Sequence, residues 1–191
     1  MLDRKNSEHG NAIIHKILIR KSLFSRKAVG KNAEVQPIAA NVDTLFICMA
    51  LNSDFNLRRL ERYISLAWDS NAIPVVVLTK SDLCSEIETK LKETEKVALG
   101  IDVIITSKIE KQGYEGILNY LAPGMTVAFV GSSGVGKSTL INLLTEDNHI
   151  ATKEIRKDDR GRHTTTGREL YITPQGAAVI DTPGMRELAI D

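Results

Sequence analysis

The sequence of 191 residues predicts an α/β fold in which helices cover both faces of a mostly parallel β-sheet. Two observations lead to this prediction. From residue 38 onward, short apolar segments alternate with segments whose apolar residues recur at helical spacing, as expected when helices join parallel strands. A glycine-rich loop at 131–138 also stands between an apolar strand and a helix. Residues 1–37 lack this alternation, so we divide the chain into an N-terminal segment, 1–37, and an α/β domain, 38–191.

Composition and charge are ordinary for a globular protein, with 42% apolar and 26% charged residues. The net charge of +1 gives no sign of polyanion binding by the whole chain, so any nucleic-acid surface must be local. The longest apolar run, 45–51, is far shorter than the roughly 20 residues of a membrane span, and we expect no membrane partner. Cys48 and Cys84 show neither metal-ligand spacing nor a disulfide framework, which suits a reducing cytoplasm.

The N-terminal segment is richer in basic than in acidic residues. We expect one strand at 12–18 and then a basic loop at 20–27, in which Leu23 and Phe24 stand among cations. That pattern fits a nucleic-acid surface and a solvated basic face equally well. The segment is too short for a core of its own and is interpreted as the remnant of a small β-module.

The α/β region is expected to alternate strands and helices up to residue 145, with the all-apolar strand at 74–79 typical of a strand buried on both faces. The expected strands are 44–49, 74–79, 102–106 and 126–130, and the expected helices are 57–67, 86–99, 115–121 and one beginning near 139. A polar loop at 146–167 follows. Two last strands, 169–173 and 177–181, are joined by a hairpin-like turn.

The glycine-rich loop matches G-x-x-x-x-G-K-[ST], the phosphate-binding P-loop. Its backbone N–H groups and the following helix N-terminus attract phosphate, Lys137 reaches the β- and γ-phosphates, and the Ser138 hydroxyl ligates Mg²⁺. The alternative is a turn that binds nothing, but the flanking strand and helix favour nucleoside triphosphate binding. The candidate phosphate-binding residues are Gly131, Ser132, Ser133, Gly134, Val135, Gly136, Lys137, Ser138 and Thr139.

A second motif, Thr79-Lys80-Ser81-Asp82, follows a strand and indicates guanine as the base. The Asp82 carboxylate can accept from both N1–H and N2–H₂ of guanine, whereas adenine would leave it unpaired. The methylene stem of Lys80 can lie along the base plane. The alternative is a surface turn with Asp82 near a helix N-cap. Thr106, Ser107 and Lys108, also at a strand end, match a weaker guanine-contacting loop.

Two further motifs concern Mg²⁺ and the γ-phosphate. Asp181-Thr182-Pro183-Gly184 matches D-x-x-G, in which Asp181 holds Mg²⁺ and the Gly184 N–H senses the γ-phosphate. The segment 162–166 occupies the place of a first switch loop, and one of its threonines, for which we favour Thr165, is expected to close on Mg²⁺. A threonine tract in a polar loop also occurs without any function.

These motifs form the set of a translation-type P-loop GTPase in circularly permuted order, with the base-reading motifs before the phosphate-binding ones. The fold tolerates this order because all these loops lie at the carboxyl edge of one parallel sheet. Linking the helix at 115–121 to the P-loop strand through Pro123 and Gly124 moves the chain ends without moving the site.

The permuted order, together with 39–43, 54–63 and 161–166, resembles the RsgA/YjeQ family over residues 13–191. Members are circularly permuted bacterial GTPases associated with maturation of the small ribosomal subunit. The resemblance implies GTP and GDP as ligands, Mg²⁺ as cofactor, the small subunit and its 16S rRNA as partners, and a monomer in the cytoplasm. In that family an OB-fold precedes and a zinc domain follows the GTPase domain. Here 1–37 resembles the end of an OB-fold, and no Cys/His cluster exists, so we expect no zinc site.

Three positions depart from related GTPases. Met185 stands where Ras-like enzymes carry a water-orienting Gln, so intrinsic hydrolysis should be slow. The resemblance suggests His163 as the catalytic group, besides Lys137 and Thr165, although His163 fits a plain loop residue or an RNA contact equally well. Gly134 replaces an Asn that binds potassium in some relatives, and Thr79 replaces the usual Asn of N-K-x-D, which removes a loop-bracing amide.

The first function hypothesis is therefore a Mg²⁺-dependent GTPase switch that acts on the small ribosomal subunit. Its rRNA contacts would come from the N-terminal basic residues and from a second basic group. That group comprises Lys153, Arg156, Lys157, Arg160 and Arg162. Two alternatives are an ATP-using P-loop NTPase and an RNA-binding module with a vestigial nucleotide site.

Overall fold

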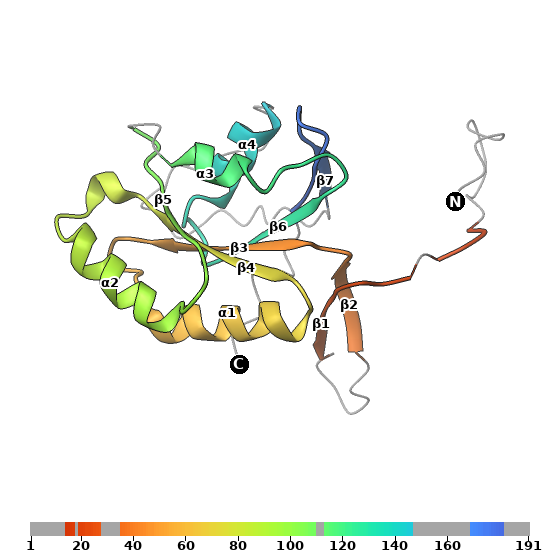
Figure 1. Cartoon of the computed structure of the whole chain (residues 1–191), viewed down its shortest axis with the longest axis horizontal. Coiled ribbons are helices and arrows are strands. Elements are labelled where there is room, and N and C mark those ends of the chain that lie inside the picture. The colour runs from red at the N-terminus through yellow and green to blue at the C-terminus, as the bar shows by residue number, and fades with distance from the viewer. Residues whose placement is uncertain (1–13, 18, 28–34, 110–112, 147–168, 182–191) are drawn as a thin grey trace, which may run out of the picture.

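The computed structural model describes residues 14–17, 19–27, 35–109, 113–146 and 169–181. These residues form a six-stranded sheet in the order β5-β4-β3-β6-β8-β7 and a separate two-stranded sheet, β1-β2 (Figure 1). The long helices lie on both sides of the larger sheet, and this confirms the predicted fold class.

Five strands of the larger sheet run parallel: β3 (Thr44–Ala50), β4 (Ile73–Thr79), β5 (Val103–Ile105), β6 (Thr126–Val130) and β8 (Ala178–Asp181). The edge strand β7 (Glu169–Ile172) pairs antiparallel with β8. β3 lies at the centre and pairs with β4 on one side and with β6 on the other. Every residue of β3 is buried, which explains why all of them except Thr44 are apolar.

Successive side chains of β3 enter two different cores. Leu45, Ile47 and Met49 pack in the core that holds α1 (Leu57–Asp69), with the helix residues Leu60 and Tyr63 fully buried. The alternate residues, of which Phe46 is one, pack in the core that holds α4 (Lys137–Thr145). α2 (Ile87–Val97) lies on the α1 side of the sheet, and α3 (Tyr114–Leu118) lies on the α4 side (Figure 1).

The prediction for the N-terminal segment was wrong in two respects. Within the predicted strand at 12–18, the described residues 14–17 contain only a single bridge residue, Ile14. The predicted loop at 20–27 instead contains β1 (Leu23–Lys27), which pairs antiparallel with β2 (Val35–Ala40). The reason is tertiary: Phe24 is fully buried in the α1-side core, and the Leu23 N–H donates to the Ser70 carbonyl at 3.2 Å. Phe24 is therefore a core residue and no part of a surface.

The predicted division at residues 37 and 38 falls within β2. Ile38 and Ala39 of this strand belong to the same core as β3. The assignment of 1–37 as the end of an OB-fold stays a prediction. Among the described residues, no helix combines the length and the apolar character that a membrane span requires.

Backbone hydrogen bonds hold the segment around Pro123 and Gly124, the predicted junction of the permutation. The Gly124 N–H donates to the Gly176 carbonyl at 3.0 Å, and the Ala178 N–H donates to the Met125 carbonyl at 2.8 Å. The link from α3 to β6 is thereby held against the turn between β7 and β8. This arrangement lets β6 enter the middle of the sheet next to β3.

Candidate nucleotide-binding site

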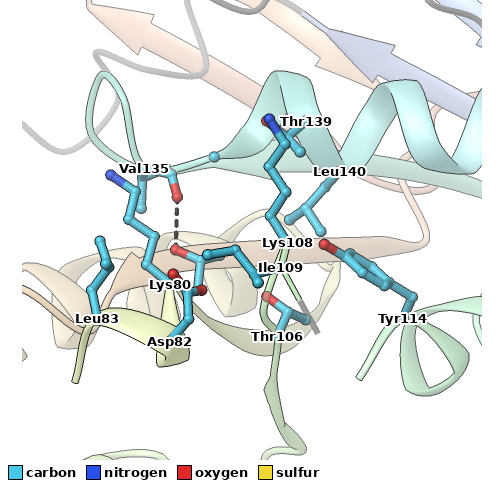
Figure 2. A pocket seen from close by; sticks show the side chains of 12 residues that line it. Lys80, Asp82, Leu83, Thr106, Lys108, Ile109, Tyr114, Val135, Thr139 and Leu140 are labelled. Atoms are coloured by element: carbon cyan, nitrogen blue, oxygen red, sulfur yellow. Dashed lines mark hydrogen bonds between the residues drawn. The ribbon is translucent and has the colours of Figure 1, made fainter. Parts of the chain in front are cut away.

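A pocket of about 250 Å³ lies among the loops that follow β4, β5 and β6 (Figure 2). It is lined by Thr79, Lys80, Asp82, Leu83, Thr106, Lys108, Ile109, Tyr114, Val135, Gly136, Thr139 and Leu140. The structure therefore brings residues of the three predicted nucleotide-binding motifs to one place, although they lie far apart in the chain. This convergence is what a permuted GTPase site requires.

The P-loop is packed tightly against β3. Gly131 has φ 142°, and a Cβ at this residue would lie 2.4 Å from the Cys48 carbonyl oxygen, so only glycine fits without a shift. Gly136, with φ 112°, is the N-cap of α4. Lys137 is 5% exposed, and its Nζ donates to the Gly131 and Ser132 carbonyls at 2.6 Å each. The ammonium is thus held inside the curve of the loop.

Cys48 lies under this loop and is fully buried. Burial raises the pKa of its thiol to about 12, and the nearby Lys137 ammonium offsets only part of that effect. Cys48 is therefore an inert thiol that packs beneath the P-loop.

Thr79 connects the loop that carries Asp82 to the P-loop. Its hydroxyl donates to the Val135 carbonyl at 2.7 Å, marked by the dashed line in Figure 2. Thr79 stands where Asn is usual, and the loss of the Asn amide was expected to remove a hydrogen bond that holds the loop. That expectation was incomplete, because the Thr79 hydroxyl makes a hydrogen bond to the P-loop instead.

Asp82 lies in η1 (Ser81–Leu83), a 3₁₀ turn that follows β4. Its Oδ1 accepts from the Ser107 hydroxyl at 2.9 Å. The N-cap of this turn is Lys80 and that of α2 is Glu86, so Asp82 caps neither helix, but the alternative of a surface turn with Asp82 near a helix N-cap stays open. Asp82 itself is exposed to solvent. Its hydrogen bonds to a base would be selective only if the bound base excluded water from the carboxylate.

The weak motif Thr106-Ser107-Lys108 is joined to the Asp82 loop. The Ser81 N–H and hydroxyl both lie 3.3 Å from the Thr106 carbonyl, to which they donate. The Thr106 N–H donates to the Leu78 carbonyl at 2.7 Å. Thr106 and Ser107 are buried, so the two base-side loops form one hydrogen-bonded unit.

Four lining residues were missed by the sequence analysis: Leu83, Ile109, Tyr114 and Leu140. They give the pocket an apolar wall suited to a flat heterocycle. Figure 2 shows Tyr114 across the pocket from Asp82. Burial raises the pKa of the Tyr114 phenol, and the Asp82 carboxylate raises it further. The only sequence signal was an aromatic residue shortly after Lys108.

Another missed contact joins the P-loop to the loop between β3 and α1. The Ser132 hydroxyl donates to the Asp54 carboxylate, and Arg59 Nη2 lies 2.8 Å from the same carboxylate. No local pattern in residues 54–63 indicated this contact.

Two of the three candidate magnesium ligands, Ser138 and Asp181, lie at the same edge of the sheet, and the third, Thr165, lies outside the described residues. Ser138 is half-buried in the first turn of α4, and Asp181 is a buried residue at the end of β8. Hydroxyl and carboxylate oxygens are donors that suit Mg²⁺ when phosphates and waters complete its shell. The described residues contain no group of three or more His, Cys, Asp or Glu side chains that could hold a metal.

Several predicted residues lie outside the described part of the chain. They are His163, Thr164, Thr165, Thr166, Gly184 and Met185, together with the basic residues from Lys153 to Arg162. The roles assigned to them stay predictions.

Comparisons with known proteins agree with this geometry. The sequence model of the RsgA GTPase family matches residues 17–191. Small ribosomal subunit biogenesis GTPase RsgA 2 of Lactiplantibacillus plantarum is 55% identical over 186 residues, which are 97% of this chain and 53% of the relative. RsgA 1 of Listeria innocua is 47% identical over 91% of this chain and 50% of the relative. The chain thus spans about half the length of the curated relatives it matches.

Two of the solved structures that are similar to the chain cover most of its length. YjeQ from Thermotoga maritima has a TM-score of 0.67 and 27% identity, with 94% of this chain and 57% of that chain covered. YloQ, described as a circularly permuted GTPase, has a TM-score of 0.57 and 22% identity, with 95% of this chain and 66% of that chain covered, and supports the fold alone.

Proposed function

Because the chain belongs to the RsgA GTPase family, we propose that it binds guanine nucleotides and hydrolyses GTP to GDP and phosphate. The main support is that one pocket combines the Asp82 loop with the P-loop. The hydrogen bond from Thr79 to Val135 fixes the two loops relative to each other. A base held at Asp82 would then carry its phosphates toward Lys137.

Base recognition is assigned to the Asp82 side of the pocket. The carboxylate accepts from N1–H and N2–H₂ of guanine, and Ser107 fixes its orientation. Lys80 offers its stem to one face of the base. Thr106 and Lys108 complete the loop that surrounds the base edge. Adenine lacks both donors at these positions, and its binding would leave the Asp82 carboxylate without partners.

Phosphate binding is assigned to the P-loop, residues 131–139. The backbone N–H groups and the N-terminus of α4 stabilise the negative charge of the β-phosphate. Lys137 leaves its present carbonyl partners in part to meet the β- and γ-phosphates. When bound, Mg²⁺ neutralises charge that develops on the phosphates, and Ser138 and Asp181 are the described residues that would hold it.

The remaining steps use residues of the two switch segments. Thr165 closes on the metal side of the site, and the Gly184 N–H meets the γ-phosphate. His163 orients the attacking water, a role that Met185 cannot fill. Basal turnover is therefore slow, and we expect it to rise when a partner brings His163 to the attacking water.

The partner is the small ribosomal subunit, for which the relatives are named. The chain acts on it as a monomer in the cytoplasm, and contacts its 16S rRNA through basic side chains that meet phosphates. We propose no membrane partner.

Titration with a fluorescent GTP analogue tests the nucleotide assignment. We expect saturable binding that GTP and GDP compete away, and that Lys137→Ala abolishes. ATP competition as strong as that of GTP would favour an ATP-using enzyme, and absence of saturable binding would favour a vestigial site. Adding purified small subunits should raise GTP turnover, and large subunits serve as the control. Unchanged turnover in a longer protein that also contains the regions present in the relatives would contradict the proposed partner.

A further inference from the structure

The loop between β3 and α1, residues 51–56, lies against the first arm of the P-loop. Asp54 makes the contact: its carboxylate accepts a hydrogen bond from the Ser132 hydroxyl. The two residues are 78 positions apart in the chain. We propose that Asp54 is a positioning residue that fixes Ser132 and, through it, the P-loop lysine; this inference rests on the nucleotide-binding function proposed above.

Asp54 is itself held in place from several sides. Arg59 Nη2 lies 2.8 Å from the Asp54 carboxylate and donates a second hydrogen bond to the Asp54 carbonyl. The Asp54 N–H donates to the Asn52 side chain at 3.0 Å. The Asn56 side chain accepts from the Arg59 N–H at 3.0 Å and so caps the first turn of α1, which carries Arg59. The carboxylate is therefore directed at Ser132 by a rigid support.

The ion pair with Arg59 also explains why an acidic group can stand beside a phosphate site. A lone carboxylate at this place would repel an anion bound in the P-loop. Arg59 supplies the opposite charge within one hydrogen-bond length, which leaves the carboxylate free to accept from Ser132 with little net charge near the phosphates.

Ser132 passes this constraint on to Lys137. Its hydroxyl is bound by Asp54, and its carbonyl accepts from Lys137 Nζ at 2.6 Å. Rotation of the Ser132 peptide would displace one of the two carbonyls that hold the ammonium. Asp54 thereby determines where the lysine stands before it meets the β- and γ-phosphates. The effect should be larger for GTP than for GDP, because only GTP has the γ-phosphate.

The test is a double-mutant cycle of Asp54→Ala and Ser132→Ala, with affinities for GDP and a non-hydrolysable GTP analogue measured by titration. Each single variant should lose about tenfold in GTP affinity, the loss of one hydrogen bond to a charged group, and clearly less in GDP affinity. The double variant should be no worse than Asp54→Ala alone, because Ser132→Ala then has no contact with Asp54 left to remove. Asp54→Asn, which keeps an acceptor, should recover most of the affinity.

Ser53→Ala is the matched control, since Ser53 is an exposed neighbour in the same loop. It should bind both nucleotides like the unaltered chain. Additive losses in the double variant, or equal losses for GTP and GDP that follow a fall in thermal stability, would reduce Asp54 to a structural residue and overturn the inference. Absence of GTP binding by the unaltered chain would instead refute the proposed function, and this inference with it.

Discussion

The Thr79 hydroxyl donates a hydrogen bond of 2.7 Å to the carbonyl oxygen of Val135, a residue 56 positions further along the chain. Both residues are buried, at 4% and 1% exposure. The bond joins the end of β4 to the P-loop and therefore sets the separation of the proposed base and phosphate subsites. A hydroxyl has a single proton, so this donor is fully used by the brace.

Replacing Thr79 by Val should test the brace. Valine keeps the shape of threonine but leaves the buried Val135 carbonyl without this donor, so we expect a loss of about 1–3 kcal/mol in the free energy of unfolding. Urea denaturation measures it. Thr79→Ser retains the hydroxyl and should lose clearly less. A valine variant as stable as the unaltered chain would show that the bond contributes nothing.

Replacing Asp82 by Asn should change the base that the pocket prefers. The amide presents an N–H to the donors of guanine, and GTP affinity should fall about 100-fold, in line with a lost hydrogen bond to a charged group and an opposed donor. Xanthosine triphosphate carries a carbonyl at C2 and should bind this variant better than it binds the unaltered chain. Competition titration gives the affinities for both nucleotides. An unchanged preference for GTP would show that Asp82 does not recognise the base.

Replacing Ser107 by Ala should weaken guanine binding without changing its selectivity. The Ser107 hydroxyl lies 2.9 Å from Asp82 Oδ1 and orients the carboxylate, so its loss should lower GTP affinity about threefold to tenfold. Ser85→Ala, on the exposed side of the same region, is the control. A Ser107 variant with full affinity would mean that the carboxylate is oriented by the base alone.

Gly131→Ala should disrupt the packing of the P-loop on β3. The new Cβ would stand 2.4 Å from the Cys48 carbonyl oxygen, and the backbone there must move. We expect a loss of about 1–3 kcal/mol in unfolding free energy together with loss of nucleotide binding. Gly124→Ala separates the causes: it has φ 81° but no atom within 4 Å of its Cβ, so it reports backbone strain alone. Equal losses in both variants would contradict the steric explanation.

The two cysteines should react differently with iodoacetamide. Burial raises the pKa of Cys48 from 9.0 to about 12, so its thiol stays protonated at pH 8, whereas Cys84 is partly exposed. Mass spectrometry of the native protein should find one label at pH 8, on Cys84, and two after unfolding. By linkage, the contribution of Cys48 to stability is present below pH 9 and is lost between pH 9 and 12, because the unfolded thiol ionises first. Rapid native labelling of Cys48 would contradict the burial.

The parts of the fold that sequence analysis predicted are those specified locally. The apolar runs that became β3 and β4 and the P-loop with its flanks can each be read within about a dozen residues. β1 was missed because the burial of Phe24 depends on contacts with distant parts of the core, and the basic residues around it suggested a loop.

Within the site, the motifs were found but their connections were not. Asp54 with Ser132 and Thr79 with Val135 are contacts across 78 and 56 positions, and no local pattern reveals them. Tyr114 was missed for the same reason: α3 turns it toward Asp82, and only the packing of α3 on the sheet decides that.

The place of β3 in the sheet has a consequence for how the protein is made. During synthesis from the N-terminus, β3, β4 and β5 emerge before β6, the strand that pairs with the second edge of β3. Until then, a strand that is apolar except for Thr44 presents an open edge to other nascent chains, the kind of edge that seeds aggregation. Guanine nucleotide cannot rescue this intermediate, since the P-loop is not yet translated. A ribosome stalled before residue 126 would therefore carry a chain with this edge uncovered, and nucleotide bound at the proposed site could stabilise only the completed domain.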